Sequence, residues 1–516
     1  MSDVGVLRDL ARARRSRRLQ DVDIFEKLYQ AYLSVIAVGV VVLAGAGLVG
    51  DDRLGHSAVA RAASDGPAIV GIVATLVLVA GLRSGMRGGP LTLEPAFVSH
   101  VLLSPVGRDE ALREPAIRQL RTAALGGGGV GALGGLLASH RLPLTALPLM
   151  VWGAVAFGSV AVAATGLAMV VAGFPVRRAV ARTVAVVLVA GSVTDLVAGT
   201  AWSPGSIVGR LATNGVRFDA VGLAAVAFAP ALAAAGVAVV GGTSIEAARR
   251  RAGLVSQLRM AVTRQDLRTV VLLQRRLAQD AARRRPWLRV PGGERLPVFR
   301  RDLRGLARLP LVRVLRVVVL CSVAVGAAVA AWQGTTPLVL VTGVATWAAA
   351  LDVIEPLAQE LDHPDRWAGY PVVPGDLLVR HLVAPGIALA VAFVPAVTAA
   401  AIAGDASTVL QVAGALGLPL CAAAVIGAAS SIATAPFDIS SSAQTMMPET
   451  VGMQLIFRMA WPPALAVLAA LPLLGARHAV EQRLSAIAGA TQFLLPLCVL
   501  IGAVSVWLSR RKPVRS

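Results

Sequence analysis

Residues 145–173 read TALPLMVWGAVAFGSVAVAATGLAMVVAG and contain no Asp, Glu, Lys or Arg. This stretch is longer than the roughly 20 apolar residues that cross a hydrocarbon core about 30 Å thick. The sequence therefore predicts a transmembrane helix here.

Similar apolar stretches recur along the whole chain. Of its 516 residues, 56% are hydrophobic and 15% are charged, whereas soluble domains carry about 25% charged residues. The chain is therefore predicted to be an all-α, polytopic membrane protein, with about twelve transmembrane helices arranged as two six-helix halves. The predicted helices lie near 29–50, 67–82, 122–139, 145–173, 179–203, 220–242, 312–331, 337–354, 381–403, 409–434, 453–475 and 485–508.

The formal net charge of +20 indicates the orientation of these helices. Membrane proteins concentrate Lys and Arg in their cytoplasmic loops. With the N-terminus inside, most of the 49 basic residues fall in cytoplasmic segments. Since the composition is biased toward Ala, Gly, Val and Arg, as in high-GC bacterial genomes, we expect a bacterial cell-membrane protein with both termini cytoplasmic. Its expected partners are membrane lipids and not nucleic acid.

The chain is predicted to have three parts: a first half (1–242), a basic cytoplasmic helical link (243–311) and a second half (312–516). A basic approach helix precedes the first span of each half, at 1–28 and 298–316. These helices contain Arg8-Asp9-Leu10 and Arg301-Asp302-Leu303. Each half also has its longer cytoplasmic loop between its second and third spans. This parallel layout indicates an internal repeat.

Enzyme signatures are absent from the sequence. It has no H-E-x-x-H and no G-x-S-x-G motif, its six histidines are scattered, and neither lysine follows a glycine as a phosphate-binding P-loop requires. One G-x-G-x-x-G string, at 126–131, opens a predicted membrane span. It is better explained by Gly127, Gly131 and Gly135, which form a smooth stripe for close helix packing. We expect no enzyme activity and no cofactor.

Two groups of polar residues allow more than one interpretation. Asp195 interrupts the predicted fifth helix, where an ionisable group is costly unless it is paired or functional. The alternative is that Asp195 lies near the outer headgroups. The string Glu360-Leu-Asp-His-Pro-Asp-Arg366 contains possible metal ligands, but its Pro- and Gly-rich surroundings favour a hydrogen-bonded loop.

Two candidate coupling segments follow the second span of each half, at 104–113 and 370–380. The first contains Arg108, Asp109, Glu110 and Arg113, and the second contains Gly375, Asp376 and Arg380. Aligning 102–113 with 369–380 pairs Asp109 with Asp376 and Arg113 with Arg380. A short helix at the inner membrane surface is suited to receive force from a cytoplasmic motor. The alternative is an interfacial helix that only anchors its loop.

These features together resemble the permease subunits of type-2 ABC exporters, in a fused form with both halves in one chain. Leu103-Ser-Pro-Val and Asp362-His-Pro-Asp-Arg366 are also similar to strings in poorly characterised bacterial membrane families of this kind. The resemblance implies basic elbow helices at 1–28 and 298–316, and coupling helices at the two candidate segments. It also implies a separate ATP-binding subunit that drives export of an unidentified substrate by alternating access.

Two other functions stay open. The first is a proton-coupled secondary transporter of the major-facilitator type, which also has six plus six helices. The acidic turn after span two of that family is missing near Leu82-Arg83-Ser-Gly-Met-Arg87. The second is a membrane scaffold that does not transport, with the basic link bound to anionic lipid or a cytoplasmic partner.

Overall fold

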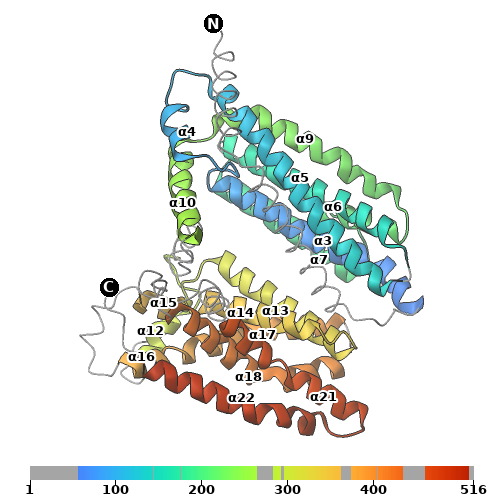
Figure 1. Ribbon diagram of the computed structural model, residues 1–516, viewed down its shortest axis with the longest axis vertical. Coiled ribbons are helices and arrows are strands. Elements are labelled where there is room, and N and C mark those ends of the chain that lie inside the picture. The colour runs from blue at the N-terminus through green and yellow to red at the C-terminus, as the bar shows by residue number, and fades with distance from the viewer. Residues whose placement is uncertain are drawn as a thin grey trace, which may run out of the picture. The chain divides into compact units, whose positions relative to one another are not determined.

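The computed structural model describes residues 56–142, 144–174, 176–263, 283–291, 296–361, 374–403, 405–433 and 460–510. Every regular element within these ranges is a helix (Figure 1). The all-α prediction is therefore confirmed. The predicted first span at 29–50 and the approach helix at 1–28 lie outside the described residues.

The described residues contain ten helices that are long and apolar enough to cross a bilayer, or eleven if one bent pair counts as a single span. The chain is thus a multi-pass membrane protein, and the total of twelve spans stays a prediction. The ten helices are Ala63–Met86, Arg108–Ser139, Ala146–Gly173, Ala179–Ala198, Ala220–Gly242, Leu311–Trp332, Gly375–Ile402, Ala406–Ala433, Ala460–Glu481 and Ala486–Ser509. The bent pair, α14 (Leu338–Val353) and α15 (Glu355–Leu361), meets at 58°.

The chain divides into two compact units, Met1–Thr263 and Arg264–Ser516. The boundary falls inside the predicted link at 243–311. Each unit has its own buried cores, in which alanine, valine and leucine predominate.

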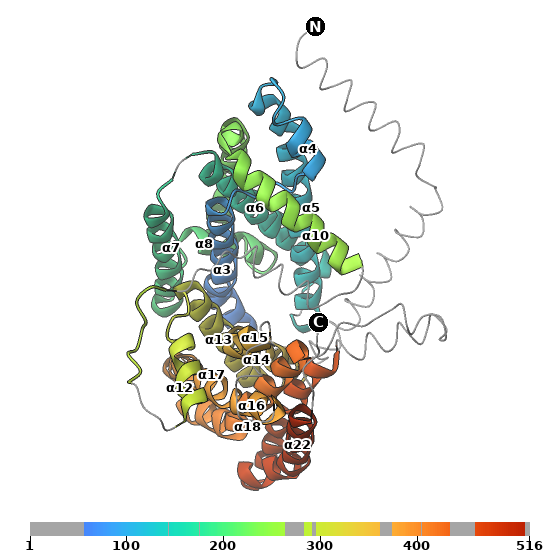
Figure 2. The same cartoon turned by 90° about the vertical axis from the view of Figure 1, so that its left-hand side faces the viewer.

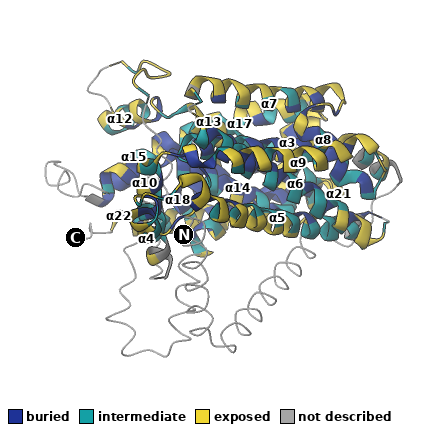
Figure 3. Cartoon of the chain, turned by 90° about the horizontal axis from the view of Figure 1, so that it is seen from above, coloured by how far each residue is buried: buried dark blue, intermediate teal, exposed yellow. Residues whose placement is uncertain are grey.

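In the first unit, α6 (Ala146–Gly173) is the central helix. It packs against α3 (His56–Met86), α5 (Arg108–Arg141) and α9 (Ala224–Val239), as Figure 1 shows. α7 (Arg178–Ala198) packs against α3 and is exposed along much of its length (Figure 3). Exposed valines on a membrane helix are suited to contact lipid.

The predicted fifth span at 179–203 is too long. α7 ends at Ala198, where Gly199 adopts a left-handed conformation with φ of 65°, a common way to terminate a helix. The chain then forms a separate short helix, α8 (Pro204–Ala212), which packs against α3. Gly205 and Gly209 of α8 lie so close to the α3 backbone that an added Cβ would collide with it.

The remaining elements of the first unit are short, apart from α10. They connect the long helices or lie at their ends. They are α4 (Pro95–His100), η1 (Thr213–Gly215), η2 (Ala220–Leu223), η3 (Val240–Gly242) and α10 (Ile245–Thr263).

In the second unit, α13 (Leu311–Trp332), α14, α17 (Val383–Ala403) and α18 (Ala406–Ala433) pack together in one bundle. α18 also contacts α21 (Pro472–Glu481) and α22 (Ala486–Ser509). α12 (Pro297–Leu306) and α16 (Pro374–Arg380) are short and pack near one end of these long helices.

Candidate functional site

The first candidate coupling segment, at 104–113, forms a turn and the start of α5. Arg108, Asp109, Glu110 and Arg113 are exposed on the first turns of the helix, whereas Ala111 and Leu112 between them are buried. The segment therefore presents charged side chains on one face and anchors itself by the other.

A hydrophobic anchoring cluster holds this segment in place. α10 packs against α4 (Figure 2), and its apolar side chains close the cluster. The Arg251 guanidinium of α10 also donates to the carbonyl of Gly89, and burial lowers the pKa of Arg251. The cluster consists of Leu91, Leu93, Val98, Leu102, Ala111, Leu112, Ala116, Met169, Val240, Ala248 and Ala252.

Asp109 also has a packing contact. Its carboxylate lies directly over Gly241 of η3, so that a Cβ added at Gly241 would collide with it. This glycine sits between α9 and α10 and lets the first turn of α5 approach closely. The position of Asp109 is therefore fixed by the end of α9.

The second candidate coupling segment, at 370–380, is described from Pro374 onward, as α16. Leu377 and Leu378 are buried, while Asp376 and Arg380 are exposed. Gly375 is buried against α22, since an added Cβ would collide with the backbone carbonyl of Ser509. α16 thus packs against the end of α22 and leads into α17 within the candidate span Gly375–Ile402.

Both segments therefore carry an aspartate and an arginine four residues apart on a short exposed helical face. In each pair, Asp109 with Arg113 and Asp376 with Arg380, the two side chains lie on the same side of the helix. No ion pair of these four side chains is found among the described residues. All four side chains are exposed.

A buried polar cluster connects α12 to α15 and to the end of α16. Arg301 pairs with Glu360 at the end of α15. Its neighbour Asp302 accepts a hydrogen bond from His381, with 2.7 Å between Oδ2 and Nδ1. Asp302, Glu360 and His381 are each no more than 2% exposed. α12 thus fixes both the end of α15 and the residue that follows α16.

Two further ion pairs lie at the same end of the unit. Arg313 binds Glu355 at 2.9 Å, and Arg316 pairs with Asp352. The predicted approach helix at 298–316 is therefore two helices, α12 and the first turns of α13. Arginine side chains of both helices form ion pairs with carboxylates of α14 or α15.

Asp195 is the intramembrane acid candidate, and neighbouring donors satisfy both of its oxygens. Oδ2 accepts from the Ser203 amide at 2.7 Å, and Oδ1 accepts from the Thr200 hydroxyl at 2.8 Å. A chain of hydroxyl contacts continues from Ser203 through Ser192 to Thr75 of α3. This geometry gives Asp195 a structural part in the turn from α7 to α8.

Gly127, Gly131 and Gly135 face α6. A Cβ at Gly131 would collide with the carbonyl of Gly153, and the other two glycines meet the α6 backbone in the same way. α5 and α6 therefore pack at close range along the predicted stripe.

Sequence reasoning missed the roles of Asp302, Glu360 and His381. The one signal was the repeated Arg-Asp-Leu string, whose second copy supplies Arg301 and Asp302 to the polar cluster. The first copy lies outside the described residues.

Among the described residues, no three His, Cys, Asp or Glu side chains form a group able to hold a metal ion. Most of the ligand-rich string at 360–366 lies outside them. No known protein family, curated protein or solved structure matches this chain.

Proposed function

We propose that this protein is the membrane permease subunit of an ABC-type exporter, powered by a separate ATP-binding subunit. It would lie in the bacterial cell membrane with both termini cytoplasmic. The observation that carries the proposal is the matched pair of exposed Asp and Arg side chains. They occur on a firmly anchored short helical face in each unit, at equivalent positions after the second predicted span.

The first coupling segment is well placed to transmit force. α5 is a continuous helix of 34 residues, which corresponds to about 50 Å of length. A push on its first turn therefore moves the membrane-spanning part of the same helix. The glycine stripe then passes the displacement to α6 through backbone contact.

The second coupling segment transmits force through side chains instead. α16 is followed directly by His381, which binds Asp302, and then by α17. A displacement of α16 would reach α12 and α17 together. Rocking of the two halves about a central path is the general mechanism of alternating access.

A proton-coupled secondary transporter is the principal alternative, with Asp195 as its proton-binding group. The two hydrogen bonds from Thr200 and Ser203 do not favour it, because they stabilise a carboxylate within its own turn. Loss of proton-coupled uptake in Asp195→Asn would favour this alternative. A scaffold without transport would show neither this effect nor an ATPase partner.

Co-purification tests the proposal. The tagged chain is extracted in a gentle detergent, and the proteins that copurify are identified by mass spectrometry. We expect a stoichiometric ATP-binding protein that is lost in the charge-reversed variants Asp109→Arg/Arg113→Glu and Asp376→Arg/Arg380→Glu.

The matched control is Glu114→Arg/Arg118→Glu. These residues form an exposed i,i+4 ion pair at 3.1 Å further along the same helix. The control variant should retain the ATP-binding protein. Absence of any such protein, under conditions that preserve a known ABC complex, would contradict the proposal.

A further inference from the structure

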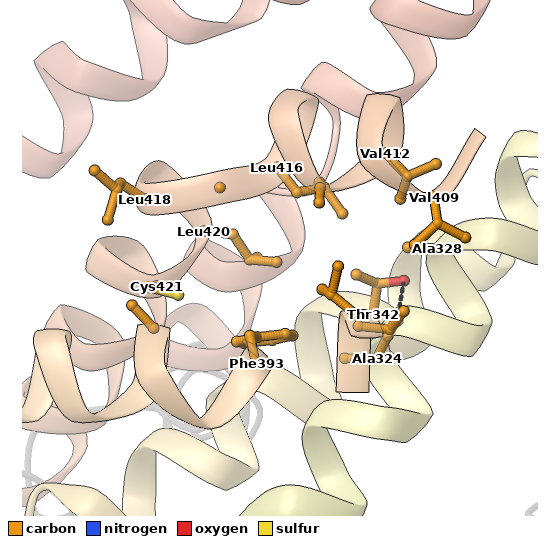
Figure 4. A pocket seen from close by; sticks show the side chains of 15 residues that line it. Ala324, Ala328, Thr342, Phe393, Val409, Val412, Leu416, Leu418, Leu420 and Cys421 are labelled. Atoms are coloured by element: carbon orange, nitrogen blue, oxygen red, sulfur yellow. Dashed lines mark hydrogen bonds between the residues drawn. The ribbon is translucent and has the colours of Figure 1, made fainter. Parts of the chain in front are cut away.

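The second unit contains a cavity of about 190 Å³ between α13, α14, α17 and α18 (Figure 4). Ala328, Phe393, Leu416 and Cys421 are among the side chains that line it. All four helices are membrane-spanning or paired in a bent span. The cavity therefore lies within the membrane-embedded bundle.

The side chains of the cavity wall are almost all apolar. Among the described lining residues, Thr342 carries the one hydroxyl. That hydroxyl already donates to the carbonyl of Leu338 at 3.1 Å, with Ala324 also close at 3.3 Å. A water molecule needs two to four polar partners, whereas apolar cavities of about 150 Å³ stay dry and accept benzene-sized groups. The cavity is suited to hydrocarbon.

The membrane helix α18 breaks at this cavity. Gly417 has φ of 25° and ψ of −134°, and Pro419 follows two residues later. A positive φ is readily adopted only by glycine, and proline supplies no N–H for the helix. Irregular backbone at membrane depth is tolerated where it is buried in protein or lines a cavity. The break is thus part of the cavity wall.

The cavity also reaches the surface of the unit. Leu418 lines it and is 74% exposed, whereas Leu416 and Cys421 on the wall are each 6% exposed. An exposed apolar side chain on a membrane-spanning helix is suited to contact the acyl chains of the bilayer. Filling the cavity with such a chain would restore the dispersion contacts that an empty space denies its lining.

We propose that the cavity at the α18 break is a binding site for one acyl chain of a bilayer lipid. The chain enters beside Leu418 and lies against Phe393, Leu416 and Cys421. This site requires no ATP-binding partner and does not depend on the function proposed above.

Photo-crosslinking tests the proposal on the full-length protein. The protein is placed in nanodiscs of phosphatidylcholine that carries a diazirine on one acyl chain, and the sample is irradiated. Peptide mass spectrometry then locates the residues that carry lipid adducts. We expect adducts on the buried wall residues Leu416 and Cys421. Adducts confined to outward-facing residues such as Leu410, which is 63% exposed, would overturn the proposal. The wild-type protein alone is sufficient for this test.

A cavity-filling variant gives a second test. Ala413 lines the cavity, and Ala413→Phe should lower the adduct yield at Cys421 about tenfold, which corresponds to about 1.4 kcal/mol. Ala399→Phe, at an exposed position on α17, is the matched control and should leave the yield unchanged. An unchanged yield in a monodisperse Ala413→Phe protein would contradict the proposal. So would wall adducts obtained with a diazirine fatty acid but not with the phospholipid, since the occupant would then be a free amphiphile.

Discussion

The hydrogen bond between Asp302 and His381 supports a quantitative prediction about the second unit. The carboxylate is 1% exposed, and His381 is its one hydrogen-bond partner among the described residues. Replacing His381 by alanine leaves a buried carboxylate without that donor. Replacing Asp302 by alanine leaves only an imidazole without its acceptor.

The two variants should therefore differ in stability. A buried carboxylate left without its partner costs about 3–5 kcal/mol, which is the expected effect of His381→Ala. A buried polar group that loses its hydrogen bond costs about 1–3 kcal/mol, which is the expected effect of Asp302→Ala. Because both substitutions remove the same interaction, the double variant should cost less than the sum of the two.

Thermal unfolding of the purified protein in detergent, followed by tryptophan fluorescence, measures these differences. A change of 1 kcal/mol shifts the melting temperature by about 2–4 °C in a domain of 150–250 residues. We expect His381→Ala to lower it by about 6 °C or more. A His381→Ala protein as stable as wild type, or one more stable than Asp302→Ala, would refute the reasoning.

Three other outcomes are expected. Gly131→Leu should destabilise the first unit by about 1–3 kcal/mol through overpacking against Gly153, whereas Gly129→Leu, where a Cβ meets open space, should be tolerated in the same thermal assay. Hydrogen bonds from Thr408 and Ser407 lower the pKa of Asp405 to about 2. This carboxylate cap of α18 should therefore stabilise the protein above the ordinary Asp pKa of 3.8. The stability difference between wild type and Asp405→Ala should shrink as the pH falls from 3.8 to about 2. A stability difference at pH 2 as large as the one at neutral pH would contradict the role of Asp405 as a cap. In a variant without its native cysteines, an impermeant maleimide applied to intact cells should label Leu484→Cys but not Arg249→Cys, and the reverse pattern would show that the predicted orientation is wrong.

The long membrane helices were predictable because one physical property, a sustained apolar run, determines them. The expected span at 145–173 is the helix Ala146–Gly173, and the span at 485–508 is Ala486–Ser509. The coupling segment at 104–113 was also expected to lead into the third span, and α5 does so without interruption.

The features that were missed depend on contacts that local sequence does not encode. α8 has only nine residues, which is too short for a transmembrane helix to be predicted from its apolar length. Its Ser-Pro start and its glycines at 205 and 209 are nevertheless typical of a packed short helix. Asp302 and His381 are 79 positions apart, so no periodicity relates them. The cavity at Gly417 arises only when four helices pack around the break.

Site-specific crosslinking tests the central claim most directly. A photoreactive amino acid is placed at position 109, at position 376 or, as a control, at the exposed position 118 of the same protein expressed in its native host. The proposed function predicts that positions 109 and 376 both crosslink to an ATP-binding subunit and that position 118 does not. A failure of both positions to capture an ATP-binding subunit, with the protein intact in the membrane, would contradict it.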